Sequence, residues 1–278
     1  MKPMIHLFVP VYNEQDTVGI LLYRVSEIMK KLRLEYEVLL VLDGCTDDSP
    51  EVVAPYLKIM PLRVIQYERR AGYARSLFAA IKRVTRQSKN PKRDFFLILD
   101  ADFSYDPSYL GKMAAQIERN VDLYSGNRFM VAGEKGPLRS RLVHKLAGLI
   151  LRLRKVDLNP GLDLLTTFRG CRVHLLRSNF TRLMVLEELG PEVPPAACAL
   201  AFLWLLYKQA ANFGQLEISE KKMRRRKSRP AFWSLFRFLL FSKKLTASAE
   251  EIERPPAARR KPRGRRYSNK ARIDSSKV

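Results

Sequence analysis

The chain has 278 residues, 46% of them hydrophobic, and a formal net charge of +23. The apolar content is ample for one large globular domain, which excludes a disordered or fibrous protein. The charge predicts a polyanionic partner: nucleic acid, an anionic membrane surface or a phosphorylated substrate.

Cysteine content and apolar run lengths limit the cellular setting. Three cysteines without a C-x-x-C pair indicate neither a disulfide framework nor a zinc site, so a reducing cytoplasm fits best. The N-terminal apolar stretch is too short for a signal peptide. No apolar stretch reaches the roughly 18 residues of a spanning helix, so no transmembrane segment is predicted.

The first half alternates between two periodicities. Four nearly continuous apolar runs predict strands buried on both faces, and helix-period segments separate them. The alternation predicts an α/β fold with a mostly parallel central sheet, whose ligands bind at the carboxyl ends of the strands. The predicted strands are 4–12, 36–43, 62–68 and 94–102, and the predicted helices are 13–32, 73–86 and 107–120.

After Arg128 the pattern changes to basic amphipathic segments. Residues 137–155 predict a helix with leucine and isoleucine on one face and Arg or Lys around the rest. The later predicted elements are a strand at 164–172, a helix ending near Met184, an apolar helix at 195–208, a strand at 213–218 and a second basic amphipathic helix at 231–244. We expect a disordered basic tail at 243–278.

The stretch "FFLILDADFSYDP" runs from a buried strand directly into two carboxylates, Asp100 and Asp102. A carboxylate pair at a strand end can bind Mg²⁺ or Mn²⁺ and leave open positions for substrate phosphates. The alternative is that both residues cap the helix that starts at Pro107. A second acidic strand end, "VLDGCTDDS", favours the metal site.

Five motifs in order, "VPVYNEQDTV", "VLDGCTDDS", "RRAGYARS", "LDADFSYDP" and "SGNRF", resemble those of family 2 glycosyltransferases of the A-type, Rossmann-like nucleotide-sugar fold. Within that family, "DADFSYDP", "SGNR", the basic helix and "DLLTTFR" are most similar to dolichol-phosphate and polyprenyl-phosphate mannose synthases. The resemblance implies a glycosyltransferase domain at 1–242, divided into a nucleotide-sugar and metal half (1–128) and an acceptor and membrane-facing half (129–242).

The resemblance also implies site residues. Asp100 and Asp102 take the metal and diphosphate, with Ser104 as a possible further ligand. The positions it assigns to the nucleotide are Pro10, Tyr12, Glu14, Asp43 and the loop glycine Gly72. Without the other motifs, Tyr12 and Glu14 read as a packed aromatic and a helix-cap acid. Leu42 replaces one acidic residue of the family pattern, and only Ser228 aligns near the end; these departures leave an inactive relative open.

The chemistry of the acceptor is predicted from what the sequence lacks. A hydroxyl acceptor needs a general base, whereas a lipid phosphate is already an anion and needs positive charge to hold it. The chain offers little that resembles a base after Asp102 but many arginines. We expect Arg128, Arg141 and Arg169 to bind the acceptor phosphate, with His144 as an assisting residue, while Lys227 and Arg229 close over the diphosphate.

The predicted reaction is metal-dependent, inverting transfer of one hexose, mannose or glucose-like, from a GDP- or UDP-sugar to a polyprenyl phosphate. The basic helices predict a peripheral protein on the cytoplasmic face of an anionic membrane, and they leave a membrane-protein partner open. The residue 142–153 stripe could equally face the core. One alternative is a hydroxyl-directed transferase using Glu187, Glu188 or Glu192. Another is a nucleic-acid-binding protein, which no known motif supports.

Overall fold

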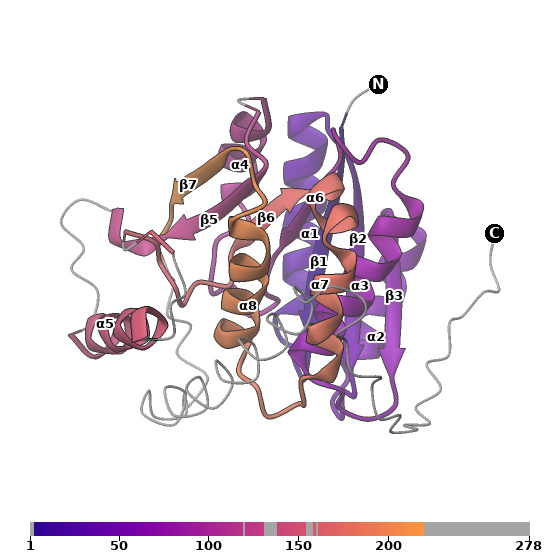
Figure 1. The fold of residues 1–278 in the computed structure, drawn as a ribbon. Coiled ribbons are helices and arrows are strands. Elements are labelled where there is room, and N and C mark those ends of the chain that lie inside the picture. The colour runs from indigo at the N-terminus through magenta and orange to yellow at the C-terminus, as the bar shows by residue number, and fades with distance from the viewer. Residues whose placement is uncertain (1–2, 119, 131–137, 154–157, 160, 220–278) are drawn as a thin grey trace, which may run out of the picture.

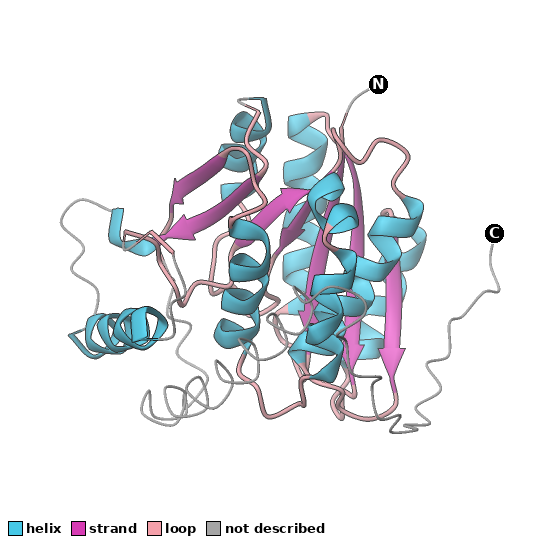
Figure 2. Cartoon of the chain, viewed as in Figure 1, coloured by secondary structure: helices cyan, strands magenta, loops and turns pink. Residues whose placement is uncertain are grey.

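The computed structural model describes residues 3–118, 120–130, 138–153, 158–159 and 161–219. Its centre is a seven-stranded sheet in the order β3-β2-β1-β4-β6-β5-β7 (Figure 1). Helices cover both faces of this sheet (Figure 2). The predicted α/β fold with a mostly parallel sheet is therefore confirmed.

The first four strands pair in parallel and form the half of the sheet nearest the N-terminus. β1 lies between β2 and β4, so the chain leaves β1 in one direction and returns on its other side. Ligands of such sheets bind outside the carboxyl ends of the strands at this point of reversal. The strands are β1 (Met4–Val11), β2 (Glu35–Asp43), β3 (Leu62–Tyr67) and β4 (Phe95–Ile98).

The remaining strands extend the sheet beyond β4 with one reversal of direction. β6 (Arg169–Arg172) lies between β4 and β5 (Leu123–Asn127) and runs antiparallel to both. β7 (Phe213–Glu217) pairs in parallel with β5 at the sheet edge. The strand predicted at 164–172 is therefore shorter than expected, and residues 164–168 form the loop that enters it.

Two apolar clusters hold the helices to the sheet, one on each face. Sheet side chains alternate between the clusters, as the two-residue period of a strand requires. One face packs against α1 (Val18–Leu32), α2 (Ser49–Val53), the 3-10 helix η1 (Ala54–Lys58) and α4 (Tyr109–Glu118). The other face packs against α3 (Tyr73–Gln87), α6 (Val173–Ser178), α7 (Phe180–Leu183), the 3-10 helix η3 (Met184–Glu188) and α8 (Pro195–Tyr207).

α3 illustrates how the sequence places a helix against the sheet. Its apolar residues recur at the three- and four-residue spacing of one helix face, and that face is buried. Gly72 precedes it at φ 98°, a conformation that glycine adopts without strain. Its buried apolar residues are Ala74, Leu77, Phe78, Ala80, Ile81 and Val84.

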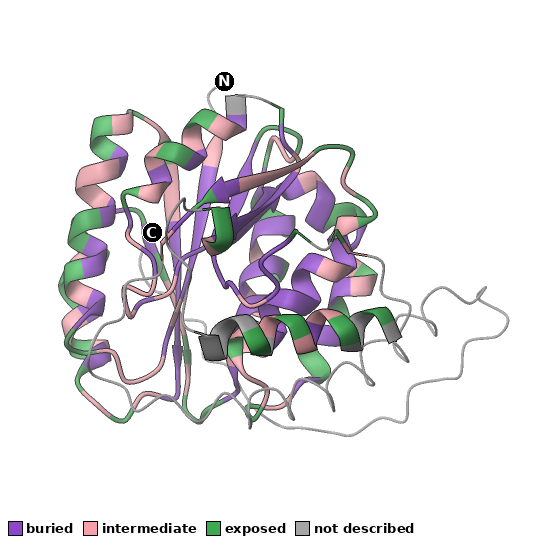
Figure 3. Ribbon diagram, turned by 90° about the vertical axis from the view of Figure 1, so that its left-hand side faces the viewer, coloured by how far each residue is buried: buried purple, intermediate pink, exposed green. Residues whose placement is uncertain are grey.

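Helix α5 (Leu138–Leu153) lies to one side of the sheet, beside the short 3-10 helix η2 (Arg128–Met130) (Figures 1 and 3). Among its described side chains, Ala147 is buried in the core, whereas Leu142 and Leu149 are exposed. The predicted helix at 137–155 is thus confirmed apart from its ends. Its leucines at 142 and 149 do not face the core.

Several predictions of detail need correction. β3 was expected to be buried on both faces, but it is an edge strand in which Arg63 and Gln66 are exposed. The segment predicted as one helix ending near Met184 is broken into α6, α7 and η3. No helix among the described residues is both long and apolar enough to cross a membrane. The predicted helix at 231–244 and the tail at 243–278 lie outside the described residues.

Candidate active site

Two carboxylates follow β4 at the carboxyl edge of the sheet. The turn that carries them holds Phe103 at φ 57°, a left-handed conformation that is uncommon for a side chain of this size. The Ser104 N–H donates to the Asp102 carboxylate at 2.9 Å. Ser104, predicted as a metal ligand, is thus observed fixing Asp102 through its backbone.

The charges at this edge are strongly unfavourable to one another. Burial raises the pKa of Asp100 to about 7, and the neighbouring charges of Asp102 and Glu14 contribute to the rise. A carboxylate that is half-buried beside two others is stabilised by a cation, because the cation removes the cost of ionising the group. We call Asp100, Asp102 and Glu14 the acidic notch.

Two side chains beside Asp100 were not predicted. The Thr167 hydroxyl donates a hydrogen bond to the Asp100 carboxylate, and Thr167 is itself buried. The buried Tyr73 hydroxyl lies beside Asp100 and lowers its pKa, opposing the effect of burial. Only the "DLLTTFR" motif could have drawn attention to Thr167.

The acidic notch has the donor chemistry that Mg²⁺ or Mn²⁺ requires. Neither ion needs a complete set of protein ligands, because water and substrate phosphates supply the remaining oxygens. The described residues contain no group of three or more His, Cys, Asp or Glu side chains placed to hold a metal. Asp100 and Asp102 would hold such a metal together with oxygens of a diphosphate.

Asp43 organises the loop between β3 and α3. Its carboxylate accepts hydrogen bonds from the N–H groups of Ala71 at 2.6 Å and Gly72 at 3.0 Å. Burial raises the pKa of Asp43, while these N–H groups oppose the rise. Gly44, at φ 66°, lies so close to Arg69 and Arg70 that an added Cβ would collide with their backbone. The end of β2, at Asp43 and Gly44, thus fixes the loop that follows β3.

Tyr12 and Arg70 form the outer wall of the same region. The Arg70 guanidinium carbon lies 4.2 Å from the centre of the Tyr12 ring, a cation–π contact at a position that the resemblance assigns to the nucleotide. Glu14 has two roles: its side chain accepts from the Thr17 hydroxyl at the start of α1, and its charge acts on Asp100. Pro10 lies within β1, opposite Val41 of β2.

Arg128 is held by a carboxylate that the sequence did not single out. Its Nε and one terminal nitrogen donate to the two oxygens of Asp163 at 2.6 and 2.9 Å. Burial would raise the pKa of the fully buried Asp163, but the hydrogen bond and charge of Arg128 lower it overall. This two-pronged contact fixes the guanidinium plane of Arg128, whose side chain keeps 15% of its surface exposed.

The expected role of Arg169 as a phosphate ligand does not agree with its location. Arg169 is fully buried, and its guanidinium donates to the backbone carbonyls of Asp163, Leu164 and Ala199. Burial lowers the pKa of Arg169 to about 10, so it remains protonated at neutral pH. The side chain braces the interior between β6 and α8. Its burial follows from a contact 30 residues away in sequence, which the motif alone could not reveal.

The other predicted acceptor residues are only partly described. His144 Nε2 lies 2.7 Å from the Leu162 carbonyl, and its ring packs edge-on against Phe129, so it ties α5 to the loop before β6. Arg141 belongs to α5, but its side chain is not described. Lys227 and Arg229 lie outside the described residues, and their predicted contact with the diphosphate stays a prediction.

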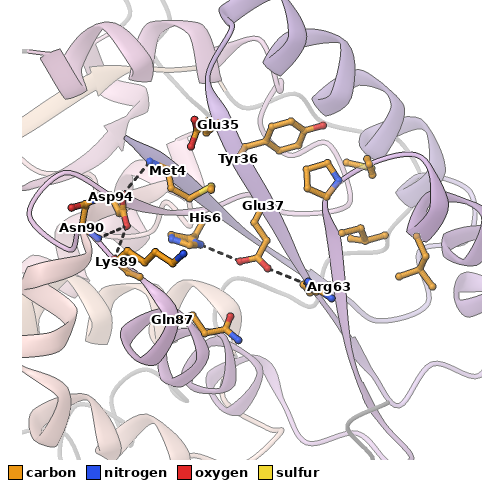
Figure 4. A pocket seen from close by; sticks show the side chains of 15 residues that line it. Met4, His6, Glu35, Tyr36, Glu37, Arg63, Gln87, Lys89, Asn90 and Asp94 are labelled. Carbon is orange, nitrogen blue, oxygen red and sulfur yellow. Dashed lines mark hydrogen bonds and ion pairs between the residues drawn. The ribbon is translucent and has the colours of Figure 1, made fainter. Parts of the chain in front are cut away.

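A cavity of about 580 Å³ lies at the opposite edge of the sheet (Figure 4). Its wall includes His6 and Glu37, which lie 3.3 Å apart, and Arg63, which lies 3.6 Å from Glu37. Burial would raise the pKa of Glu37, but His6, Arg83 and Arg63 lower it overall. These charges compensate one another within the wall. Since the cavity lies at the amino ends of β1, β2 and β3, it is separate from the acidic notch.

Residues 7–180 match the family described as Glycosyl transferase family 2. The chain is a family 2 glycosyltransferase. The match covers more than half of the chain and includes every described site residue from Pro10 to Arg169. It confirms the family resemblance that the motifs predicted.

Curated relatives resemble about half of the chain. An undecaprenyl-phosphate 4-deoxy-4-formamido-L-arabinose transferase of Pseudomonas fluorescens is 29% identical over 129 residues, which cover 45% of this chain and 36% of the relative. A dolichol-phosphate mannosyltransferase of Pyrococcus furiosus is 25% identical over 151 residues, which cover 54% of this chain and 40% of the relative. The chain thus matches well under half the length of either relative.

Solved structures confirm the fold of this family 2 enzyme at low sequence identity. Mannosyl-3-phosphoglycerate synthase of Rubrobacter xylanophilus has a TM-score of 0.61 at 14% identity, with 91% of this chain and 78% of the other covered. TarS 1–349 of S. aureus with UDP-GlcNAc has a TM-score of 0.53 at 20% identity, covering 84% and 61%. A glucosyl-3-phosphoglycerate synthase of Mycobacterium tuberculosis, solved with Mn²⁺ and UDP, has a TM-score of 0.58 at 16% identity, covering 89% and 78%.

The loop packed on Gly44 generates a stability prediction. Gly44→Ala should destabilise the protein by roughly 1–3 kcal/mol, because a Cβ meets backbone and the φ is left-handed. Gly111→Ala in α4, where the nearest atom to an added Cβ is 3.9 Å away, should instead stabilise it by about 0.5–1 kcal/mol. Urea unfolding of both variants measures the difference, and equal free energies would contradict the packing described.

The raised pKa of Asp100 predicts that replacing this residue by a neutral one stabilises the protein, and that the gain in stability depends on pH. The folded protein binds an extra proton between the ordinary pKa of an aspartate and about 7, so stability falls as pH rises through that window. Asp100→Asn should therefore raise the melting temperature of the metal-free protein by a few degrees at pH 8 and by much less near pH 4.5. The exposed Glu51→Gln serves as the control and should show no such trend.

Proposed function

We propose that this family 2 glycosyltransferase transfers a single hexose from a nucleoside diphosphate sugar to a polyprenyl phosphate, with Mg²⁺ or Mn²⁺ and with inversion. The observation that carries the proposal is that one short segment contacts both the acidic notch and Arg128. Thr167 contacts Asp100, and Asp163, four residues earlier, holds Arg128. One half suits a metal-bound diphosphate, and the other suits an anionic acceptor.

The donor half is supported by the arrangement at the ends of β1, β2 and β4. Asp100 and Asp102 would hold the metal, which offsets the charge that develops on the departing diphosphate. Tyr12 and Arg70 offer a flat wall for a base. A solved structure of the same fold contains Mn²⁺ and UDP. These observations favour a nucleotide sugar, and the choice between UDP and GDP is left to the assay.

The acceptor half is supported by the charge of Arg128 and by the names of the relatives. The two curated relatives are named for undecaprenyl phosphate and dolichol phosphate. A phosphate monoester is already ionised at neutral pH, so its attack requires orientation by positive charge rather than a general base. A guanidinium whose plane is fixed by Asp163 is suited to orienting such a group.

The reaction balances without a proton transfer. An oxygen of the acceptor phosphate forms a bond to the anomeric carbon of the sugar from the face opposite the leaving group. The bond between that carbon and the donor diphosphate breaks, and the nucleoside diphosphate keeps the electron pair. Arg128 would hold the attacking phosphate, and the acidic notch would hold the donor diphosphate. The configuration at the anomeric carbon is therefore inverted.

The outer face of α5 supports a peripheral location on an anionic membrane, with the cytoplasmic face as the proposed side. Exposed leucines alternate there with exposed basic residues, the composition of a helix lying in a lipid interface. The neighbouring η2 adds further exposed apolar surface. The residues are Leu142, Lys145, Leu149 and Arg152 in α5 and Phe129 and Met130 in η2.

A hydroxyl-directed transferase of the same fold is the second candidate. It is favoured by the contact between Gly72 and Pro191, where an added Cβ would collide, because this contact brings the segment bearing Glu192 to the donor loop. If Glu192 acts as a base, Glu192→Gln should abolish turnover with an alcohol acceptor. In the polyprenyl phosphate reaction the same variant should remain active.

Removing a notch carboxylate tests the proposed reaction. Purified protein is incubated with Mn²⁺ or Mg²⁺, a short polyprenyl phosphate and a panel of UDP- and GDP-sugars, and new glycolipid is measured. Asp102→Asn should reduce turnover by at least about a hundredfold, because the diphosphate loses its metal. Asp106→Asn, four residues further along, should stay active. An unaffected Asp102→Asn variant would refute the site assignment.

The outer face of α5 gives a separate prediction on membrane binding. Leu142→Glu should weaken binding to vesicles containing anionic lipid by roughly ten- to a hundredfold, because burying one leucine is worth about 1.5–3 kcal/mol. Ile20→Glu in α1 is a matched control, since Leu142 and Ile20 are each 58% exposed. Cosedimentation of the full chain with vesicles measures both variants. Equal binding by the two would exclude α5 as a docking face.

A further inference from the structure

The residues that precede and enter β6, Asp163–Arg169, contact both halves of the site. We call these seven residues the 163–169 segment. Asp163 accepts hydrogen bonds from Arg128, and Thr167 donates one to Asp100. Arg169, the last residue of the segment, is fully buried. Since β6 lies between β4 and β5, the segment is positioned where the acceptor half of the sheet meets the donor half.

At the acceptor end, the contacts of Asp163 leave Arg128 little freedom. Besides the two bonds from the Arg128 side chain, Asp163 accepts the backbone N–H of Arg128 at 3.3 Å and that of Leu165 at 3.1 Å. Four donors therefore converge on one fully buried carboxylate. A buried carboxylate with this many donors is ordered, and it imposes its orientation on the arginine.

At the donor end, Thr167 acts directly on a proposed metal ligand. Its hydroxyl bonds to one oxygen of Asp100, and its side chain is 8% exposed. A hydrogen bond to a metal-binding carboxylate selects the oxygen and the rotamer that face the metal. Thr166 begins the same turn by accepting the N–H of Phe168 at 3.2 Å. The loop conformation that presents Thr167 is thus locally fixed.

Arg169 connects the first residues of the segment to α8. Its guanidinium bonds to the carbonyls of Asp163 and Leu164 at 3.1 Å each and to the carbonyl of Ala199 in α8. These bonds close the 163–169 segment into a compact turn and attach it to α8. The buried charge is accommodated by peptide oxygens and by the nearby Asp163 carboxylate.

We propose that the 163–169 segment is a positioning element that sets the acceptor phosphate in line with the donor sugar, an inference that rests on the proposed function. Thr167 positions Asp100, Asp163 positions Arg128, and Arg169 fixes the spacing between them. Transfer between two bound anions depends on this spacing, because a misplacement of about 1 Å can cost a hundredfold in rate.

The donor arm of the test uses Thr167 in the full chain. Thr167→Val should weaken binding of Mn²⁺ together with UDP or GDP by about 10–100-fold, as loss of a bond to a metal ligand does elsewhere. Thr167→Ser keeps the hydroxyl and should restore binding. Calorimetry measures the affinity, and unfolding curves confirm that each variant is folded. Wild-type affinity in the valine variant would overturn the role of Thr167.

The acceptor arm uses Asp163 and Arg128. Asp163→Asn should raise the KM for polyprenyl phosphate at least about tenfold, while affinity for Mn²⁺ and nucleotide changes less than about twofold. Arg128→Lys keeps the charge but loses the two-pronged contact, so it should show the same split even if Asp163→Asn does not fold. If both residues were merely structural, the variants would contain less active enzyme, but the KM for polyprenyl phosphate and the affinity for Mn²⁺ and nucleotide would be unchanged. That result would overturn the inference.

The two arms separate this inference from the proposed function. If the wild type binds Mn²⁺ and nucleotide but forms no glycolipid, the polyprenyl phosphate proposal fails, while the Thr167 arm still decides the role of the segment at the donor. If the wild type is active but neither Thr167→Val nor Arg128→Lys shows its expected defect, the proposed function stands and the positioning role fails.

Discussion

The fold holds three carboxylates, the acidic notch, close together although their charges repel one another. Asp100 is held beside Asp102 and Glu14 although burial and both neighbouring charges oppose its ionisation. The three carboxylates stay together because each is fixed by a different element. Asp100 follows the end of β4, Asp102 is held by the turn at Ser104, and Glu14 is held at the start of α1. Such crowding of like charges is typical of sites that bind a cation or stabilise a changing charge.

The parts of this enzyme that follow local rules were predictable from sequence. β1, β2 and α3 carry continuous or periodic apolar patterns, and their positions agree with the predictions. α1 begins at Val18 rather than at Asn13, and β4 ends at Ile98 rather than at Asp102. The acidic strand ends at Asp43 and Asp100 were predictable for the same reason, since parallel strands bring their carboxyl ends to one edge.

What could not be predicted depends on partners distant in sequence. β3 is a half-exposed edge strand because no strand of the described residues pairs on its outer side, which depends on sheet order rather than on composition. Arg169 resembled a surface arginine in an acceptor motif, yet it is buried because Ala199 and Asp163 supply carbonyls for it. Asp163 and Thr167 acquire importance only through Arg128 and Asp100, which lie 35 and 67 residues away.

The antiparallel strand β6 has a consequence for how this domain assembles. The edge of β4 beyond β1 stays unpaired until Arg172, 74 residues after the end of β4, has joined the sheet. During synthesis the first four strands can associate earlier, while their open edge could recruit a neighbouring chain. Because the strand that pairs with this edge continues the segment bearing Asp163 and Thr167, the same pairing that covers the edge of β4 also brings these two residues to the proposed site.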